Sequence, residues 1–310
     1  MIMEVIKTSM QTTIQDLGRT GFRHLGVNLS GALDKPALKL ANHLVGNSEN
    51  AAGLEINLGQ SVFVFKRDAW IALTGADFNA HIGKEPVWCG WRTHIKAGQQ
   101  LSLRGGNSGM RAYLAVDGGL DVPVVMGSRS TDLSAQMGGF QGKQLENGDS
   151  IPLGPASLAI RRQVGAIQYV NDHRIRALAG SEMSAFTPSA QALFWQSEWT
   201  ISTSSNRMGT RFQGTPLTLQ QPLELNSHAV MPGVIQVPPS GLPIALLADA
   251  QTTGGYPKVA TVIDADLWKL AQTRPGQKVQ FVEVSLEEAT AARQEWQHYF
   301  YQLGISLNAS

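Results

Sequence analysis

A short pattern recurs along this chain: a glycine is followed by glutamine or aspartate, and then by apolar residues at every second position. Four copies begin at Gly59, Gly98, Gly148 and Gly276. Each copy is typical of a turn that leads into a strand with one buried face. The irregular spacing of the copies excludes a solenoid or a propeller. The 32 glycines and 14 prolines supply turns for many short strands, so the sequence predicts a mostly β fold.

The chain is long enough for two domains, and we expect two β units. The copies at Gly98 and Gly276 come late in each half of the chain, which is consistent with two similar units. Residues 154–170 contain turn residues and few core residues, as a domain boundary does. We therefore predict an N-terminal β domain over residues 1–160. A C-terminal β domain with a terminal helix is predicted over residues 161–310.

Two helices carry clear terminal signals. Asp34 precedes a lysine and a proline and is followed by apolar residues at helical spacing, which predicts a short helix that Gly46 ends. Ser285 and Glu288 form a capping box that begins the terminal helix, which Gly304 is expected to end. The apolar face of this terminal helix predicts docking on its own domain, and contact with a partner protein is the alternative.

Composition excludes several classes of function. The net charge is +1, which gives no electrostatic surface for nucleic acid or for a membrane. No apolar run reaches the length of a membrane span, and the first residues do not form a signal peptide. Cys89 is the one cysteine, so no intrachain disulfide can form and a reducing cytoplasm is expected. Charged residues make up 16% of the chain, a low share that suggests a surface covered by a partner.

Four polar stretches, punctuated by glycine, combine a cationic side chain with hydroxyl and amide groups. They are residues 12–34, 111–132, 205–211 and 233–258. Recognition of a carboxylate or a phosphate uses this mixture, because guanidinium, hydroxyl and backbone N–H groups all donate hydrogen bonds. In the fourth stretch, two apolar strands precede a loop from Asp249 to Tyr256 whose Gly254 and Gly255 allow close approach of a ligand. This loop is the strongest candidate for a binding site.

Familiar catalytic motifs are missing from the sequence. There is no Walker A loop, no Gly-x-Ser-x-Gly elbow, and no histidine or cysteine spacing typical of a metal site. The candidates for general acid or base are Asp16, Asp34, Asp249 and Asp264, although a helix cap would equally explain Asp34 and Asp264. Residues 127–131 are interpreted either as a ligand-binding loop or as a capped turn.

In this order, the four stretches resemble the allophanate hydrolase subunit 2 type, also called the biotin-dependent carboxyltransferase family. That family includes the antagonist of a sporulation-kinase inhibitor. The resemblance covers nearly the whole chain, and it is carried by TTIQDLGRTG with SGALD, RAYLAVDGG with GSRSTD, SNRMG, and GVIQVPPSGLPIALLADAQTTGGYPK with IDADLWKLAQTRPGQKVQF.

The resemblance implies two cyclophilin-like β-barrel units with a few short helices. It also implies one component of an ATP-dependent 5-oxoprolinase, which converts 5-oxo-L-proline to L-glutamate. On this interpretation the chain and a partner, the B subunit of the 5-oxoprolinase, activate the lactam by phosphorylation, and the A subunit completes the ring opening. ATP with Mg²⁺ is the expected cofactor. Biotin is not expected on this chain, because no carrier lysine lies in an Ala/Val-Met-Lys-Met context.

From the resemblance we predict three sets of site residues, since phosphoryl transfer needs positioning and stabilisation of charge. The catalytic candidates are Arg111, Arg207, Asp249 and Lys258. The candidates for binding the lactam are Asn206, Gln236, Gln251, Thr252, Thr253 and Tyr256. The candidates for binding the phosphates of ATP are Arg19, Ser128, Arg129, Ser130 and Thr131. No metal-ligating residue is predicted.

Two alternatives from other classes stay open. The chain would be the carboxyltransferase component of a biotin-dependent urea or amide carboxylase if biotin arrived on another protein. It would be a non-catalytic regulator if it bound and antagonised a kinase inhibitor. Plain binding does not need so many polar loops, which favours an enzyme.

Overall fold

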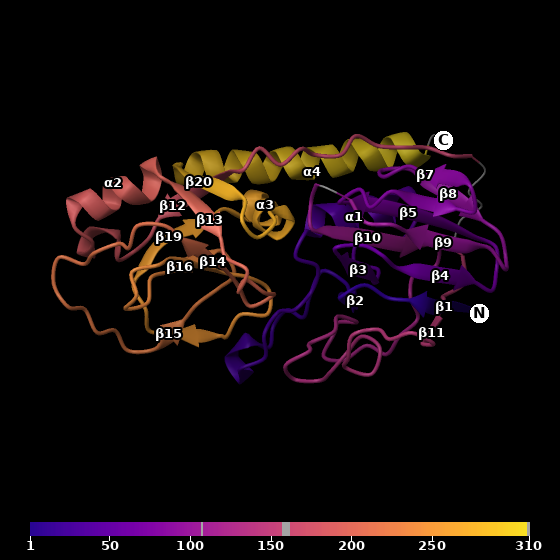
Figure 1. The fold of residues 1–310 in the computed structure, drawn as a ribbon, viewed down its shortest axis with the longest axis horizontal. Coiled ribbons are helices and arrows are strands. Elements are labelled where there is room, and N and C mark those ends of the chain that lie inside the picture. The colour runs from indigo at the N-terminus through magenta and orange to yellow at the C-terminus, as the bar shows by residue number, and fades with distance from the viewer. Residues whose placement is uncertain (107, 157–161, 309–310) are drawn as a thin grey trace. The chain divides into compact units, whose positions relative to one another are not determined.

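The computed structural model describes residues 1–106, 108–156 and 162–308, and Figure 1 shows its elements. The chain divides into two compact units. Unit 1 comprises residues 1–20, 30–169 and 299–310, and unit 2 comprises residues 21–29 and 170–298. The predicted boundary between residues 160 and 161 lies outside the described residues. The prediction also placed residues 21–29 in the N-terminal domain and residues 299–310 in the C-terminal domain. In the structure, residues 21–29 belong to unit 2 and residues 299–310 belong to unit 1.

Unit 1 contains two antiparallel sheets. The first has the order β11 (Ser150–Pro152), β1 (Ile2–Lys7), β4 (Val62–Phe65), β9 (Gln100–Leu103), β6 (Ala80–Ile82) and β7 (Glu85–Val87). The second has the order β2 (Gln11–Gln15), β3 (Gly53–Asn57), β10 (Arg111–Val116), β5 (Ala69–Gly75) and β8 (Arg92–Ile95). Apolar side chains of both sheets, such as Phe63 and Leu114, form one buried core.

Strand β10 is buried along its whole length, because both of its faces are covered. Leu114 points into the core between the sheets, whereas Tyr113 packs with Leu38 of helix α1 (Lys35–Leu44). The predicted cap of α1 is confirmed, since the Asp34 carboxylate accepts a hydrogen bond of 2.9 Å from the backbone N–H of Ala37.

Unit 2 is built on a closed barrel of seven strands. Its order is β12 (Arg174–Ala179), β19 (Lys258–Val262), β16 (Val234–Gln236), β17 (Ile244–Leu246), β14 (Gly209–Gln213), β13 (Glu198–Ile201) and β20 (Lys278–Glu283). Strands β12 and β20 are parallel, and the other neighbours are antiparallel. Ile175, Phe212, Ile235 and Phe281 fill the interior. A separate two-stranded ribbon joins β15 (His228–Ala229) to β18 (Thr253–Gly254).

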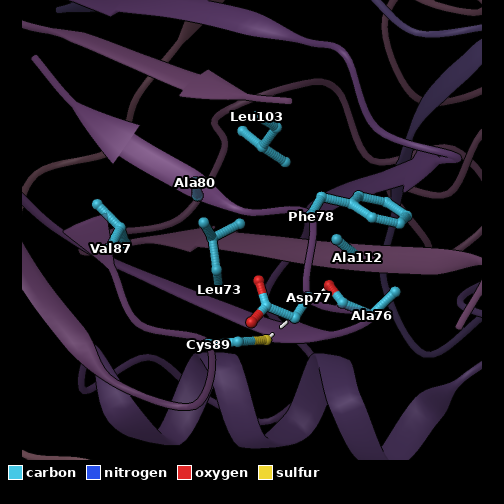
Figure 2. A pocket seen from close by; sticks show the side chains of 9 residues that line it. All are labelled: Leu73, Ala76, Asp77, Phe78, Ala80, Val87, Cys89, Leu103 and Ala112. Carbon is cyan, nitrogen blue, oxygen red and sulfur yellow. Dashed lines mark hydrogen bonds between the residues drawn. The ribbon is translucent and has the colours of Figure 1, made fainter. Parts of the chain in front are cut away.

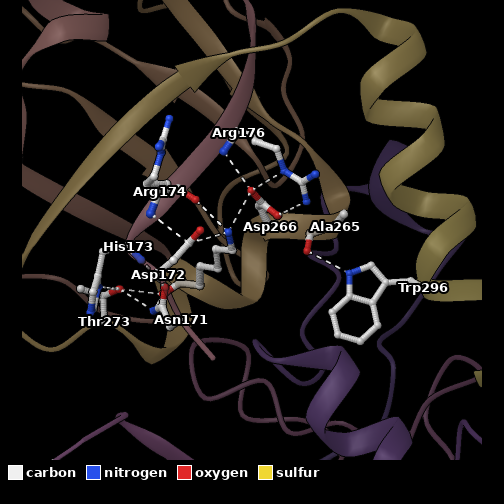
Figure 3. Close-up of polar contacts among 10 residues, drawn as sticks. Asn171, Asp172, His173, Arg174, Arg176, Ala265, Asp266, Thr273 and Trp296 are labelled. Carbon is white, nitrogen blue, oxygen red and sulfur yellow. Dashed lines mark hydrogen bonds and ion pairs between the residues drawn. The ribbon is translucent and has the colours of Figure 1, made fainter. Parts of the chain in front are cut away.

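Short helical segments cover parts of unit 2. They are η1 (Arg23–Leu25), η2 (Met183–Ala185), α2 (Pro188–Gln196), η3 (Asp264–Asp266) and α3 (Leu267–Gln272). Figure 3 shows the contact between Asp266 of η3 and Arg176 of strand β12. The buried Asp266 carboxylate accepts hydrogen bonds from the Arg176 guanidinium at 2.7 and 3.0 Å, and Lys269 Nζ lies 3.5 Å away. Lys269 also donates to Asp172 at 2.7 Å.

The terminal helix α4 (Leu286–Asn308) begins at the predicted capping box, which is confirmed. Ser285 N–H donates to the Glu288 carboxylate at 2.7 Å, and Glu288 N–H donates to Ser285 Oγ at 3.2 Å. The prediction that Gly304 ends this helix is wrong, because α4 continues through it. A single interior glycine costs only about 1 kcal/mol relative to alanine, which does not end a long helix.

The prediction of a mostly β chain with a few helices is therefore confirmed. Seven of the described strands of unit 2 close into a barrel, whereas those of unit 1 form two sheets around one core. The two units thus have different strand arrangements. No helix within the described part of the chain combines the length and the apolar character needed to cross a membrane.

Candidate functional site

In unit 2, a buried ion pair stands at the start of the predicted substrate loop. Arg207 Nε and Nη2 donate to the two carboxylate oxygens of Asp249 at 2.8 and 3.0 Å. Their side chains are 5% and 7% exposed. Asp249 N–H in turn donates to the Arg207 carbonyl at 3.1 Å. The structure thus brings together two of the predicted catalytic residues, with a planar two-point contact that only arginine provides.

The middle of the loop rests on a buried amide. Gln236 is 2% exposed, and its Nε2 donates to the Tyr256 carbonyl at 3.3 Å. A methyl group added at Gly254 would lie 2.8 Å from Gln236 Nε2, so a larger residue here would require the Gln236 side chain to shift. Gln236 therefore contacts the backbone of the loop at Tyr256 from the buried side.

The remaining loop side chains predicted to bind the lactam are at the surface or partly so. Gln251, Thr253 and Tyr256 are exposed, and Thr252 is partly buried. Asn206 is also exposed, but its side-chain oxygen accepts a hydrogen bond of 2.9 Å from Met208 N–H and so closes its own turn. The loop thus presents hydroxyl and amide groups outward from a fixed base.

Lys258, the third predicted catalytic residue in this unit, begins β19 and is partly buried. Its Nζ lies 2.5 Å from His228 Nε2 and 3.5 Å from a carboxylate oxygen of Glu182. Burial raises the pKa of Glu182, but contacts with Ser181 and Lys258 lower it more, so the net pKa lies below the ordinary 4.5. His228 and Glu182 were not predicted from the sequence.

Arg23 is a further residue that sequence reasoning missed. It lies in η1, within the short segment that belongs to unit 2. Its Nη2 donates to the carbonyls of Val230 and Gln251 at 2.5 and 3.2 Å. One guanidinium therefore connects the residue after β15 with a residue just before β18. In the sequence, Arg23 is an arginine between Gly21 and Gly26. This local pattern does not predict a contact with residues about two hundred positions away.

In unit 1, the predicted phosphate-binding loop surrounds a carboxylate of the protein itself. The Asp16 side chain accepts hydrogen bonds from Ser128 Oγ at 2.7 Å, Ser130 Oγ at 2.5 Å and Arg129 N–H at 2.6 Å. A fourth donor is Gly18 N–H at 2.8 Å. Ser128, Ser130 and Asp16 are all at most 2% exposed.

The other members of that predicted set are also engaged. Arg19 is fully buried, and its Nε and Nη2 donate to the carbonyls of Val125 and Ser130 at 3.0 and 2.9 Å. Thr131 is buried and donates from Oγ1 to the Ile14 carbonyl at 3.0 Å. Arg129 places its partly exposed guanidinium 2.9 Å from the Val122 carbonyl. Arg19 Nη1 is buried and has no hydrogen-bond partner among the described residues. The other contacts named here are with protein oxygens, so the loop does not form a ready cradle for a phosphate.

Arg111, the fourth predicted catalytic residue, is buried in unit 1. Its Nε lies 3.6 Å from the Glu55 carboxylate. That carboxylate also accepts hydrogen bonds from Tyr113 Oη at 2.7 Å and from Leu33 N–H at 3.0 Å. Burial, together with the neighbouring charge of Glu55, raises the pKa of Tyr113, which therefore serves as a hydrogen-bond donor. This network fixes the turn before α1.

Figure 2 shows the side chains that line a small cavity of unit 1. Its volume is about 10 Å³, close to the space that one water molecule needs. It is lined mostly by apolar side chains, with Cys89 and Asp77 at one side. Burial raises the pKa of the Cys89 thiol to about 12, which makes it a poor nucleophile. The described residues hold no group of three or more His, Cys, Asp or Glu side chains arranged for a metal ion.

The comparisons with known proteins agree on one family. The family described as carboxyltransferase domain, subdomains A and B, matches residues 25–283. The C subunit of the 5-oxoprolinase of Escherichia coli K12 is 50% identical and covers 99% of both chains. The protein of the same name from Haemophilus influenzae is 44% identical over 97% of both chains.

Fungal proteins share the same domain inside much longer chains. Urea amidolyase of Saccharomyces cerevisiae is 29% identical over 94% of this chain, which corresponds to 17% of that protein. The crystal structure of the Kluyveromyces lactis urea amidolyase matches with a TM-score of 0.91 at 28% identity. That match covers 97% of this chain and 20% of the fungal chain.

Proposed function

Since this chain belongs to the carboxyltransferase-domain family, we propose that it is one component of an ATP-dependent 5-oxoprolinase. The complete enzyme converts 5-oxo-L-proline to L-glutamate. This chain and the B subunit of the enzyme activate the lactam by phosphorylation, and the A subunit completes the ring opening. The observation that carries the proposal is the 50% identity to the C subunit of a 5-oxoprolinase across 99% of both chains.

The loop of residues 249–256 in unit 2 is the proposed lactam site. A lactam offers one carbonyl acceptor and one N–H donor, and 5-oxoproline adds a carboxylate. The outward hydroxyl and amide groups of Thr252, Thr253 and Gln251 supply both kinds of partner. Arg207 and Gln236 hold the loop from its buried side, so the binding groups are placed before the substrate arrives.

ATP is proposed as the co-substrate because an unstrained amide resists hydrolysis until its oxygen becomes a leaving group. The donors of Ser128, Ser130 and Arg129 are directed at Asp16, so they do not fit a phosphate as they stand. We therefore derive no catalytic step for ATP from this loop. The site that transfers the phosphoryl group is formed in the assembled complex of this chain with the B subunit.

Coexpression with candidate A and B subunits, followed by an assay of ATP-dependent glutamate formation from 5-oxoproline, tests the proposal. We expect turnover by the complex and almost none by this chain alone. Substitution Lys258→Ala should lower kcat/KM by a factor on the order of 10² with the complex intact. Full turnover by the isolated chain would rule out a shared site, and an inactive complex would rule out the function.

A second candidate is the carboxyltransferase component of a biotin-dependent urea carboxylase. The likeness to the fungal urea amidolyase structure, with a TM-score of 0.91, favours it. Urea and 5-oxoproline are both small amides, so one loop could serve either substrate. Transfer of a carboxyl group from carboxybiotin on a separate carrier protein to urea, measured with the same purified complex, separates the two functions.

A further inference from the structure

Lys258 is the centre of a three-residue cluster in unit 2. Its Nζ lies 2.5 Å from His228 Nε2 and 3.5 Å from Glu182 Oε2. The same Glu182 oxygen accepts the backbone N–H of Lys258 at 2.9 Å. All three side chains are partly buried. Three separate segments thus contribute one group each, and the lysine side chain is held from two sides.

The hydrogen bonds fix the proton positions on His228. Its Nδ1 lies 2.9 Å from the carbonyl oxygen of Asn226. A carbonyl oxygen can only accept, so Nδ1 carries the proton. In the neutral imidazole, Nε2 then has a free lone pair, and at 2.5 Å it accepts a hydrogen bond from the Lys258 ammonium.

This arrangement orients the ammonium group. Of its three N–H bonds, one donates to His228 Nε2 and a second is directed toward Glu182. Among the described residues, Nζ has no third partner. One N–H bond of a fixed cation is therefore left for an acceptor from outside the chain.

The cluster lies beside the loop proposed to bind the lactam. His228 pairs directly with Gly254 in the β15–β18 ribbon, and Ala229 pairs with Thr253. On the barrel, Lys258 pairs with Gln236, whose side chain supports the same loop. These pairings place the Lys258–His228 contact beside the strand that carries Thr253 and Gly254.

We propose that His228 is a positioning residue that orients the Lys258 ammonium toward a carbonyl or carboxylate oxygen of a small amide substrate. The inference rests on the proposed function, since it assigns the lactam as that substrate. Removal of the His228 acceptor should therefore weaken binding of the substrate.

Two substitutions separate positioning from a purely structural role. In His228→Gln the amide oxygen can replace Nε2 as an acceptor. In His228→Asn the shorter side chain can still contact the Asn226 carbonyl but does not reach Lys258. Steady-state kinetics of the complex with the A and B subunits should show a KM for 5-oxoproline raised about tenfold in His228→Asn, with a smaller change in kcat. His228→Gln, which retains an acceptor, should keep the KM of the unchanged protein.

His81→Asn is the matched control. His81 makes the same contact from Nδ1 to the carbonyl two residues earlier, at 3.0 Å to Asn79, but lies in unit 1 on β6. Its KM should equal that of the unchanged protein. A His228→Asn variant that behaves like His81→Asn would overturn the inference. If His228→Asn does not fold, His228→Gln decides, and a KM raised about tenfold in this variant, which retains an acceptor, would overturn the inference.

A measurement without turnover separates this inference from the proposed function. A complex that does not convert 5-oxoproline would rule out the proposed function, but the contact between His228 and Lys258 could still be tested. The ¹⁵N signals of the His228 ring in the isolated chain then test the positioning contact. An Nδ1–H tautomer whose Nε2 signal shifts in Lys258→Met supports the contact, and an Nε2–H tautomer or an unshifted signal overturns it.

Discussion

Arg207 and Asp249 form a buried ion pair with two parallel hydrogen bonds of 2.8 and 3.0 Å. The pair connects the turn before β14 to the start of the 249–256 loop. Removing one member of such a pair leaves an uncompensated charge in the interior, which is more damaging than the loss of the bond itself. The pair therefore has to be intact for the loop to keep its place.

Substitution Arg207→Ala should lower the free energy of unfolding by about 3–5 kcal/mol, because it leaves the Asp249 carboxylate buried without a cation. Arg207→Lys should lower it less, since it retains the charge and loses the two-point geometry. Urea unfolding measures both. The matched control is Arg211→Ala on strand β14, where the side chain is exposed, and there we expect a change within about 0.5 kcal/mol. Equal effects at the two arginines would contradict this account.

Arg23→Met should increase the mobility of the loop without unfolding the barrel. The guanidinium of Arg23 joins the carbonyls of Val230 and Gln251, and the substitution removes both contacts while keeping the apolar part of the chain. Hydrogen exchange followed by mass spectrometry should show faster exchange over residues 249–256 and unchanged exchange in β16 and β19. His24→Ala, at an exposed neighbour, should leave both regions unchanged. Slow exchange of the loop in Arg23→Met would show that the loop does not depend on this contact.

The sequence predicted those features whose signal is local. The capping box of Ser285 and Glu288 and the cap at Asp34 each join residues three positions apart, and the structure contains both. The alternation of polar and apolar residues in β9 likewise reports a buried face directly. At these positions the partners lie within a few residues, so composition and order suffice to predict them.

Other features depend on partners that are distant in sequence. Asp16 was a candidate acid or base, but its carboxylate is surrounded by donors more than one hundred residues away. Arg23 contacts a carbonyl 207 residues further along the chain. His228 has a defined role only because the β15–β18 ribbon brings it next to Lys258. No local pattern encodes these pairings, since the tertiary fold creates them.

Ser130→Ala should destabilise unit 1 by about 1–3 kcal/mol, because it removes a buried hydroxyl that donates to Asp16 and accepts from Asp16 N–H. Thermal or urea unfolding measures the loss, and the KM of the complex for ATP should stay the same. Ser134→Ala, at an exposed serine two residues beyond this stretch, should be neutral within about 0.5 kcal/mol. A raised KM for ATP with unchanged stability would instead support phosphate binding by this loop.

Cys89 should resist alkylation in the folded protein. Burial raises the pKa of its thiol from 9.0 to about 12, which lowers the thiolate fraction at pH 8 by about 10³-fold, and the thiolate is the species that reacts. The rate of iodoacetamide labelling at pH 8 should therefore be slower by at least this factor than in urea-unfolded protein. The chain has one cysteine, so the mass change reports Cys89 alone. Because the folded pKa is raised, the protonated thiol also favours the folded state, and this contribution should be lost as the pH rises from 9.0 to about 12. Equal labelling rates in the folded and unfolded protein would show that Cys89 is open to solvent.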